Sequence, residues 1–220
     1  MKKLKKLKKL ILLLMVITSF VQPLTIYAAS KTPAQKLDEQ LEQAKKVELV
    51  QKFFRLSTSY DIKIDGKVVG TLTGDFWHPF GDSLKIESSD GTVIYSEQQS
   101  RRMLSLSIAR GGVFYNQAGE FDGALRENVW ALFWHQYQFL DKSGTVIAAS
   151  RRNPWQLFST GYQVKDTQGV KLYRATTERW HLTKQIKIER LGDDDKVSMK
   201  QMLIVTAIEE AIAESKAKDK

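Results

Sequence analysis

The chain lacks cysteine altogether, and proline and glycine are sparse, at 4 and 13 of 220 residues. The absence of cysteine excludes a disulfide scaffold, a thiolate zinc site, a cysteine nucleophile and a lipid-modified N-terminal cysteine. The low proline and glycine contents exclude a proline-rich or collagen-like chain. What is present, 42% hydrophobic and 27% charged residues, is typical of one globular domain with accessory segments.

Acidic residues are also absent before Asp38, whereas six lysines lie within the first nine positions. These lysines supply six of the nine excess positive charges, so the rest of the chain carries only about +3. A body with so small a charge gives no support to nucleic-acid binding, and we expect no nucleic-acid partner.

Residues 1–29 have the pattern of a signal peptide or a membrane anchor. The lysine-rich start is followed by an apolar run from Leu10 to Phe20 and then by small residues around Ala28, where a signal peptidase would cut. Because the stretch up to Ala29 carries no charge, it is also long enough to span a bilayer as an uncleaved anchor. Either way we expect an exported protein, which is extracellular or anchored at the outer face of a bacterial cytoplasmic membrane. Pro23 favours cleavage.

Residues 30–55 are predicted to form an amphipathic helix or linker. Thr32, Pro33 and Gln35 supply an N-cap, a first-turn proline and the second half of a capping box. An apolar stripe then recurs at helical spacing, at Leu37, Leu41, Ala44 and Val47. This face could bind a partner, but a one-sided helix more often packs on its own domain.

Residues 56–214 change to short alternating runs separated by Gly-containing turns, which indicates an all-β domain. A shift of 78 residues superimposes Gly66 on Gly144 and Gly91 on Gly169. The same shift matches aromatic and strand positions, and each copy is expected to hold four to five strands. These matched pairs include Trp77 with Trp155, Phe80 with Phe158, Leu84 with Tyr162, Ile86 with Val164, and Tyr95 with Tyr173. We expect the matched Trp and Phe residues to fill core layers, and Val129–Trp134 to form a strand buried on both faces.

The segment from Met199 to Ala213 is apolar on nearly every face, so a helix there must be buried on most sides. A sheet that closes around it would bury the helix and leave no free edge strand. The sequence therefore predicts a mainly β protein, a closed barrel around a hydrophobic C-terminal helix, with a solvated tail at 215–220.

Several segments resemble the LURP-one-related family of the tubby C-terminal and phospholipid-scramblase superfamily. Tyr60–Gly70 and Ser83–Ile94 are similar to its first two hairpins, Tyr137–Ala149 and Tyr162–Tyr173 to their equivalents, and Met202–Ile212 to its closing helix. The resemblance covers about Phe54 to Ala213. It implies a twelve-stranded barrel around a central helix and a non-enzymatic module linked to membranes. It transfers no ligand residue, because no basic cluster matches the tubby pattern.

The sequence offers no catalytic residues, no metal site and no cofactor site. His78, His135 and His181 are not at metal-ligand spacing, and no G-x-S-x-G elbow is present. The contiguous acids at 193–195 lack the alternate spacing of a calcium loop and suit a turn before a helix.

The ligand contact we predict is Arg151, Arg152 and the nearby Trp155, where cations adjoin an aromatic residue. The first hypothesis is an exported binding module whose partner is an anionic membrane surface or an envelope protein. One alternative is an enzyme with a site at an open barrel end, using His135 or His181. The other is a hollow, lipocalin-like carrier, which requires the C-terminal helix to lie outside the barrel.

Overall fold

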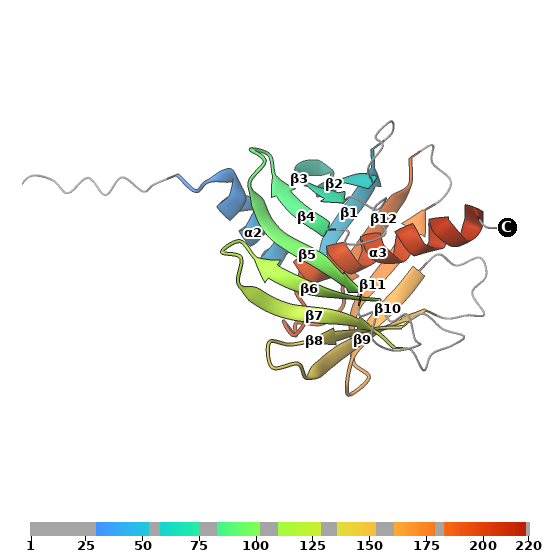
Figure 1. Cartoon of the computed structure of the whole chain (residues 1–220). Helices are drawn as coiled ribbons and strands as arrows, with labels where there is room; N and C mark the ends of the chain where they lie inside the picture. Colours follow the sequence, from blue (N-terminus) through green and yellow to red (C-terminus); the bar gives the residue numbers. More distant parts are fainter. Residues whose placement is uncertain are drawn as a thin grey trace, which may run out of the picture. The chain divides into compact units, whose positions relative to one another are not determined.

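The computed structural model describes residues 30–52, 58–74, 83–101, 110–128, 136–152, 161–178 and 183–218. Residues 31–220 belong to one compact unit (Figure 1). Its strands are β1 (Lys46–Gln51), β2 (Thr58–Ile64), β3 (Lys67–Gly74), β4 (Ser83–Ser88), β5 (Val93–Arg101), β6 (Arg110–Asn116), β7 (Phe121–Glu127), β8 (Tyr137–Leu140), β9 (Val146–Arg152), β10 (Gly161–Asp166), β11 (Lys171–Glu178) and β12 (Gln185–Arg190). The helices are α2 (Pro33–Gln43) and α3 (Met199–Lys218).

The twelve strands form a closed antiparallel barrel in which each strand pairs with its neighbours in the chain and β1 pairs with β12. This confirms the predicted fold class. Each half holds six strands rather than four or five, and the 78-residue shift carries β4 onto β10 without a gap. Leu84 and Tyr162 are both buried, as are Tyr95 and Tyr173, so the matched positions occupy equivalent places in the core.

One end of the barrel, which we call the turn end, is built from tight hairpins. In four of them the residue that opens the turn accepts a hydrogen bond from a glycine N–H three residues later. These glycines have φ between 75° and 87°, a conformation that glycine adopts without steric cost. They are Gly91, Gly119, Gly144 and Gly169.

We call the opposite end the distal end. Because the strands alternate in direction, six of them reach it at their last residues. These are Gln51, Gly74, Arg101, Glu127, Arg152 and Glu178.

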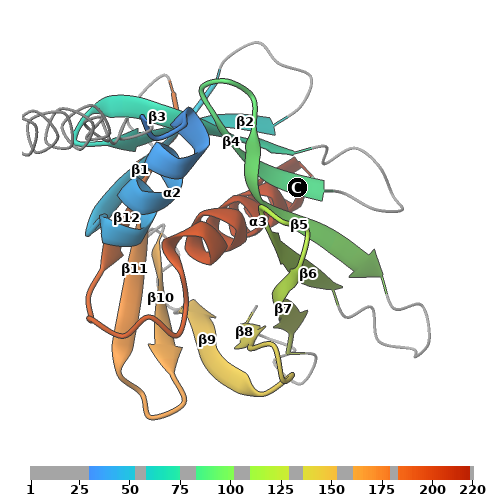
Figure 2. The ribbon, with the colours of Figure 1, turned by 90° about the vertical axis from the view of Figure 1, so that its left-hand side faces the viewer.

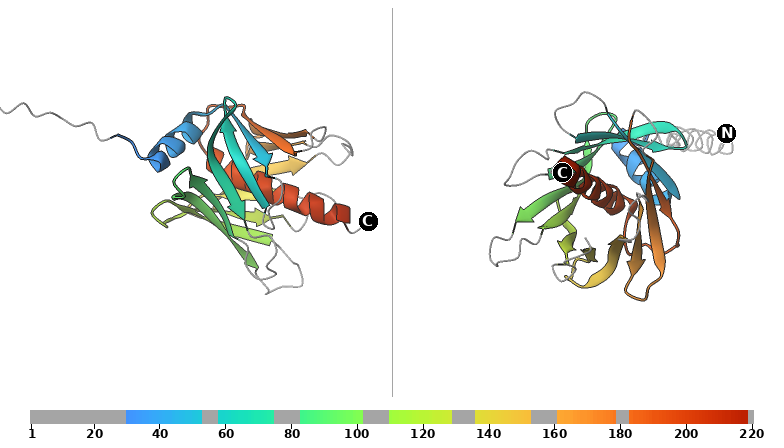
Figure 3. Two further views of the ribbon diagram at one scale, coloured as in Figure 1. Left: turned by 90° about the horizontal axis from the view of Figure 1, so that it is seen from above. Right: turned by 90° about the vertical axis from the view of Figure 1, so that its right-hand side faces the viewer.

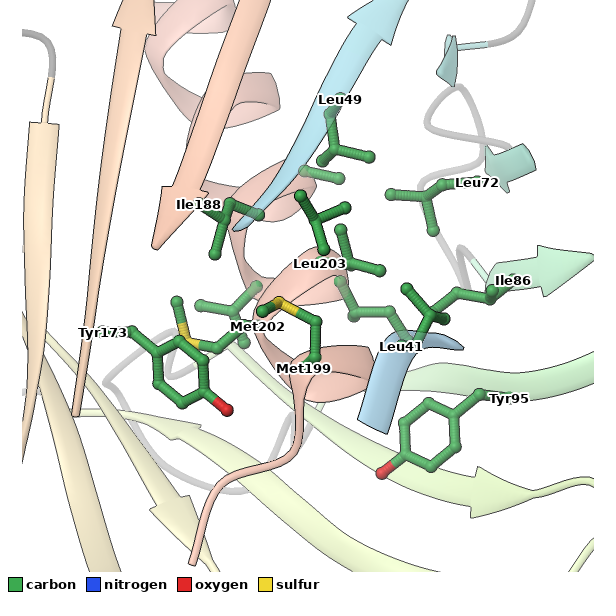
Figure 4. Close-up of a cluster of buried hydrophobic side chains, with 14 of the residues drawn as sticks. Leu41, Leu49, Leu72, Ile86, Tyr95, Tyr173, Ile188, Met199, Met202 and Leu203 are labelled. Carbon is green, nitrogen blue, oxygen red and sulfur yellow. The ribbon is translucent and has the colours of Figure 1, made fainter. Parts of the chain in front are cut away.

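The helix α3 enters from the turn end and runs through the barrel, and Figure 2 shows the strands arranged around it. Ser198 and Gln201 form a reciprocal capping box, with backbone-to-side-chain distances of 3.0 and 3.2 Å. Residues 201–210 are all buried. Around the first turns, Met199, Met202 and Leu203 pack against inward residues of the strands, as Figure 4 shows. A hollow carrier would need α3 to lie outside the barrel. Here α3 lies inside and fills the lumen that such a carrier requires.

The helix α2 lies at the turn end against α3, β4 and β5, and buries Ala34, Leu37 and Leu41. Its capping box between Thr32 and Gln35 is present as predicted. The approach is close at β3, because a Cβ on Gly70 would lie 2.7 Å from both Leu37 Cδ2 and the Glu87 carbonyl oxygen. The apolar face therefore packs on its own domain.

Two predicted boundaries are wrong. The helix within 30–55 ends at Gln43, and the barrel begins at Lys46 rather than at 56. Val47 and Leu49 are buried while Lys46 is exposed, which is the two-residue period of a strand. At the other terminus α3 continues to Lys218, past the predicted tail boundary at 215, because residues 214–218 contain good helix formers and no Gly or Pro.

Other predictions fall outside the described residues. They concern Val129–Trp134 and the core roles of Trp77, Phe80, Trp155 and Phe158.

Candidate binding end of the barrel

The two ends of the barrel differ in the segments that join their strands. At the turn end the hairpins are short, whereas the strands that reach the distal end are joined by six longer segments. Those segments are 52–57, 75–82, 102–109, 128–136, 153–160 and 179–184. In the sequence they contain all five tryptophans and all three histidines of the chain. The topology therefore brings to one end the strand connections in which the tryptophans of the sequence occur, which are 75–82, 128–136, 153–160 and 179–184.

Of the predicted contact residues, Arg151 and Arg152 are the last two residues of β9 and lie at the distal end. They pair in the ladder with Gln163 and Tyr162 of β10. Trp155 lies outside the described residues.

The sequence analysis did not select a second pair of arginines at the same end. Arg101, the last residue of β5, pairs directly with Arg110, the first residue of β6. Their pairing depends on the register of a hairpin whose connection spans 102–109. The sequence signal that could have identified Arg101 and Arg110 is the strand pattern on each side of residues 102–109.

Among the described residues around the β1–β12 closure, two lysines near the distal end pair with carboxylates of the chain. Lys52 Nζ lies 2.7 Å from Asp61 Oδ1, and Lys187 Nζ lies 2.8 Å from Glu178 Oε1. The hydrogen bond and charge of Glu178 raise the pKa of Lys187. Within each pair the two opposite charges neutralise each other.

Inside the barrel, the second half of α3 makes polar contacts with the wall. The carboxylate of Glu210 forms a buried ion pair with Lys184 and accepts a hydrogen bond of 2.8 Å from the hydroxyl of Thr177. Thr206 and the Tyr162 hydroxyl lie 2.6 Å apart. Since Lys184 directly precedes β12, the Glu210 pair links α3 to a strand end at the distal end. Figure 3 shows α3 leading to the C-terminus on that side.

The turn end is occupied by the protein's own side chains. Lys200 of α3 binds Asp38 of α2 at 2.5 Å, and its Nζ lies 5.6 Å from the centre of the Tyr95 ring. The Tyr95 hydroxyl donates to Asp122 at 2.9 Å. Burial, together with the Asp122 carboxylate, raises the pKa of Tyr95 above its usual value. The distal end is therefore the better candidate for external contacts.

Within the described part of the chain, His, Asp and Glu side chains form no group of three or more that could hold a metal ion. No helix among the same residues has both the length and the apolar character needed to cross a bilayer.

The fold and its two unlike ends define a barrel that is filled by its own helix α3 and carries α2 at one end. Comparison with known proteins adds no relative, since no family model and no curated protein matches the chain.

Proposed function

We propose that the chain is an exported, non-enzymatic binding module of the cell envelope, and that its distal end attaches to a membrane surface. The proposal includes membership of the LURP-one-related family, which the sequence resembles and whose expected fold agrees with the barrel around α3.

The observation that carries this proposal is the difference between the two ends. The strand connections at the distal end hold every tryptophan of the chain, and basic residues end β5 and β9 there. Tryptophan favours the boundary between water and lipid, where its apolar ring and its N–H group are both accommodated. Binding surfaces are commonly built from the longer connections at one end of a rigid scaffold.

The competing functions have less support. A carrier needs a lumen, which α3 fills. The histidines considered for an enzyme, His135 and His181, lie outside the described residues. Recruitment of an envelope protein through α2 would require its apolar face, which is buried.

The test is co-sedimentation of residues 30–220 with vesicles, after circular dichroism has confirmed that this unit is folded. We expect binding to vesicles of phosphatidylcholine and phosphatidylglycerol in equal parts, weaker at high salt because ions screen the charges. Bound protein should show tryptophan emission shifted to shorter wavelength, since all five tryptophans belong to distal connections. Failure to sediment with either these or pure phosphatidylcholine vesicles would overturn the proposal and favour an envelope protein as the partner.

A further inference from the structure

The outer surface of the barrel has an apolar region on β6, β7, β8 and β9. The inward residues Phe114, Leu125 and Phe139 are at most 3% exposed, so the residues that alternate with them face outward. Strand pairing joins four outward residues, one from each strand, into a continuous, half-buried row. They are Val113, Ala124, Leu140 and Val146.

A second outward row lies beside the first, nearer the distal end. It consists of Gly111, Arg126, Gln138 and Ala149, in the order of the strands. Arg126 is the one charged residue of the two rows, and its guanidinium donates to Gln138 Oε1 at 2.9 and 3.2 Å. Toward the turn end the region continues to Phe121, whose side chain is 41% exposed. We call the two rows together the β6–β9 wall.

The opposite side of the barrel has opposite charges at the equivalent positions. β1 and β7 are six strands apart in the ring of twelve, and Figure 2 shows them on opposite sides of α3. Lys63 and Leu140 each stand beside the bulge of an equivalent hairpin. On the preceding strand Lys63 is paired with Glu48. Leu140 is paired there with Ala124, so an apolar pair on one side corresponds to a charge pair on the other.

We infer that the β6–β9 wall is the contact surface of a homodimer, in which it packs against the same wall of a second copy. Because the closed barrel leaves no free strand edge, a second copy has to pack wall against wall. In a two-fold dimer one patch meets itself. The inference is independent of membrane attachment.

A two-fold axis that runs along the strands, between β7 and β8, makes the wall complementary to itself. In the first row, this axis sets the small Ala124 of one copy opposite the larger Leu140 of the other. In the second row, it sets Arg126 opposite Gln138 of the other copy rather than opposite a second arginine. The two like charges therefore do not face each other, and the amide that binds Arg126 within the chain also meets it across the contact.

The same axis leaves both distal ends on one side of the dimer, where both could reach one membrane. An anionic membrane is a poorer occupant for the wall itself, because a single cation that is already hydrogen-bonded offers it little attraction.

The size of the wall indicates a weak dimer. With strands about 4.8 Å apart and a rise of about 3.4 Å per residue, the two rows and Phe121 cover roughly 20 Å in each direction. This footprint is at the small end for specific complexes, so the association should be reversible and depend on concentration.

The first test is sedimentation equilibrium of residues 30–220, after circular dichroism has confirmed that this unit is folded. We expect monomer and dimer in exchange. Leu140→Lys should weaken the dimer at least tenfold, roughly the effect of an unpaired charge placed in an apolar contact. The control is Val50→Lys on β1, which is also an outward, half-buried apolar residue but lies on the opposite side. Thermal unfolding of each variant checks that the barrel is intact.

Two outcomes of this test would overturn the inference. One is a monomer at every concentration up to about 1 mM, which corresponds to an affinity of about 4 kcal/mol. The other is equal weakening of the dimer by Val50→Lys and Leu140→Lys.

Cross-linking of the full chain locates the contact. Because the chain has no cysteine, one introduced cysteine is the single site for a short bismaleimide. Packed sheets lie about 10 Å apart, a distance that such a reagent spans. We expect Ala124→Cys to give a cross-linked dimer and Val50→Cys to give none. Equal cross-linking at both sites would contradict the assigned wall, whereas absence of cross-linking with intact vesicle binding would overturn the dimer and leave membrane attachment standing.

Discussion

At the scale of single residues, Asp166 joins a hairpin turn to the segment that leads into α3. Its carboxylate accepts hydrogen bonds from the backbone N–H groups of Gln168 and Val170, at 2.9 and 2.8 Å, and from Lys196 at 3.2 Å. Burial opposes ionisation of this carboxyl, but these donors outweigh burial and lower the pKa of Asp166 below its usual value.

The lowered pKa makes stability depend on pH in a definite direction. The folded protein binds the Asp166 proton more weakly than the unfolded chain does, whose aspartate pKa is about 3.9. The carboxylate therefore stabilises the fold above about pH 4, and this stabilisation is lost as the pH falls through the folded-state pKa.

We predict that Asp166→Asn lowers the urea midpoint at pH 7, because the amide keeps an acceptor for the turn but loses the charge that binds Lys196. The difference from the wild type should shrink at pH 3. The control is Asp141→Asn, where a carboxylate accepts the same turn hydrogen bonds, from the N–H groups of Ser143 and Thr145, while the adjacent Lys142 pairs with Asp122. A larger loss at Asp141 than at Asp166 would contradict the role given to Lys196.

At the scale of elements, the buried ion pair between Lys184 and Glu210 fixes how α3 sits in the barrel. A helix that is apolar on nearly every face has little reason to prefer one rotation, whereas a buried charge pair has one geometry. The hydrogen bond from the Thr177 hydroxyl to Glu210 and the contact between the Thr206 and Tyr162 hydroxyls also favour this one rotation of α3.

We predict that Glu210→Gln destabilises the fold by about 3 kcal/mol, since removal of one partner leaves the other charge buried. The double variant Lys184→Met with Glu210→Leu should recover part of that loss. Urea unfolding of the wild type, the two single variants Lys184→Met and Glu210→Leu, and the double variant gives the coupling energy directly. Strictly additive losses would show that the two side chains do not interact across the lumen.

The same elements show what the sequence could and could not predict. The duplication, the Gly turns and the apolar C-terminal segment were enough to predict a barrel around a helix, because a repeat, a turn motif and a long apolar run can each be recognised directly in the sequence. The strand β1 was missed because Ala44 and Val47 continue the three- and four-residue spacing of α2, although the helix stops at Gln43. Spacing alone cannot distinguish a helix from a short strand over so few residues.

Only part of the candidate site could be predicted, because sequence spacing does not show which residues of different strands are paired. Arg151 and Arg152 adjoin each other in the sequence, so their shared location needed no structure. Arg101 and Arg110 are paired through the β5–β6 register, and the ion pair between Lys184 and Glu210 joins residues on different elements. Such contacts depend on strand pairing, which the sequence does not specify residue by residue.

At the scale of the whole molecule, the barrel and α3 depend on each other. The inward side chains of the strands, among them Leu49, Ile62, Leu72 and Ile86, are at most 1% exposed because α3 fills the space between them. Without α3 the apolar residues on the inner surface of the barrel would be exposed to water. They would also lose the packing contacts that they make with the helix.

We predict a graded response to loss of this plug. Leu203→Ala should lower the free energy of unfolding by about 2–5 kcal/mol, the range for a leucine removed from a close-packed core. Deletion of residues 199–220 should abolish cooperative thermal unfolding and allow a hydrophobic dye to bind. Deletion of 219–220 alone is the control and should change neither property. A cooperative, dye-free barrel without α3 would mean that the twelve strands are stable as an open vessel, and would restore the carrier as a possible function.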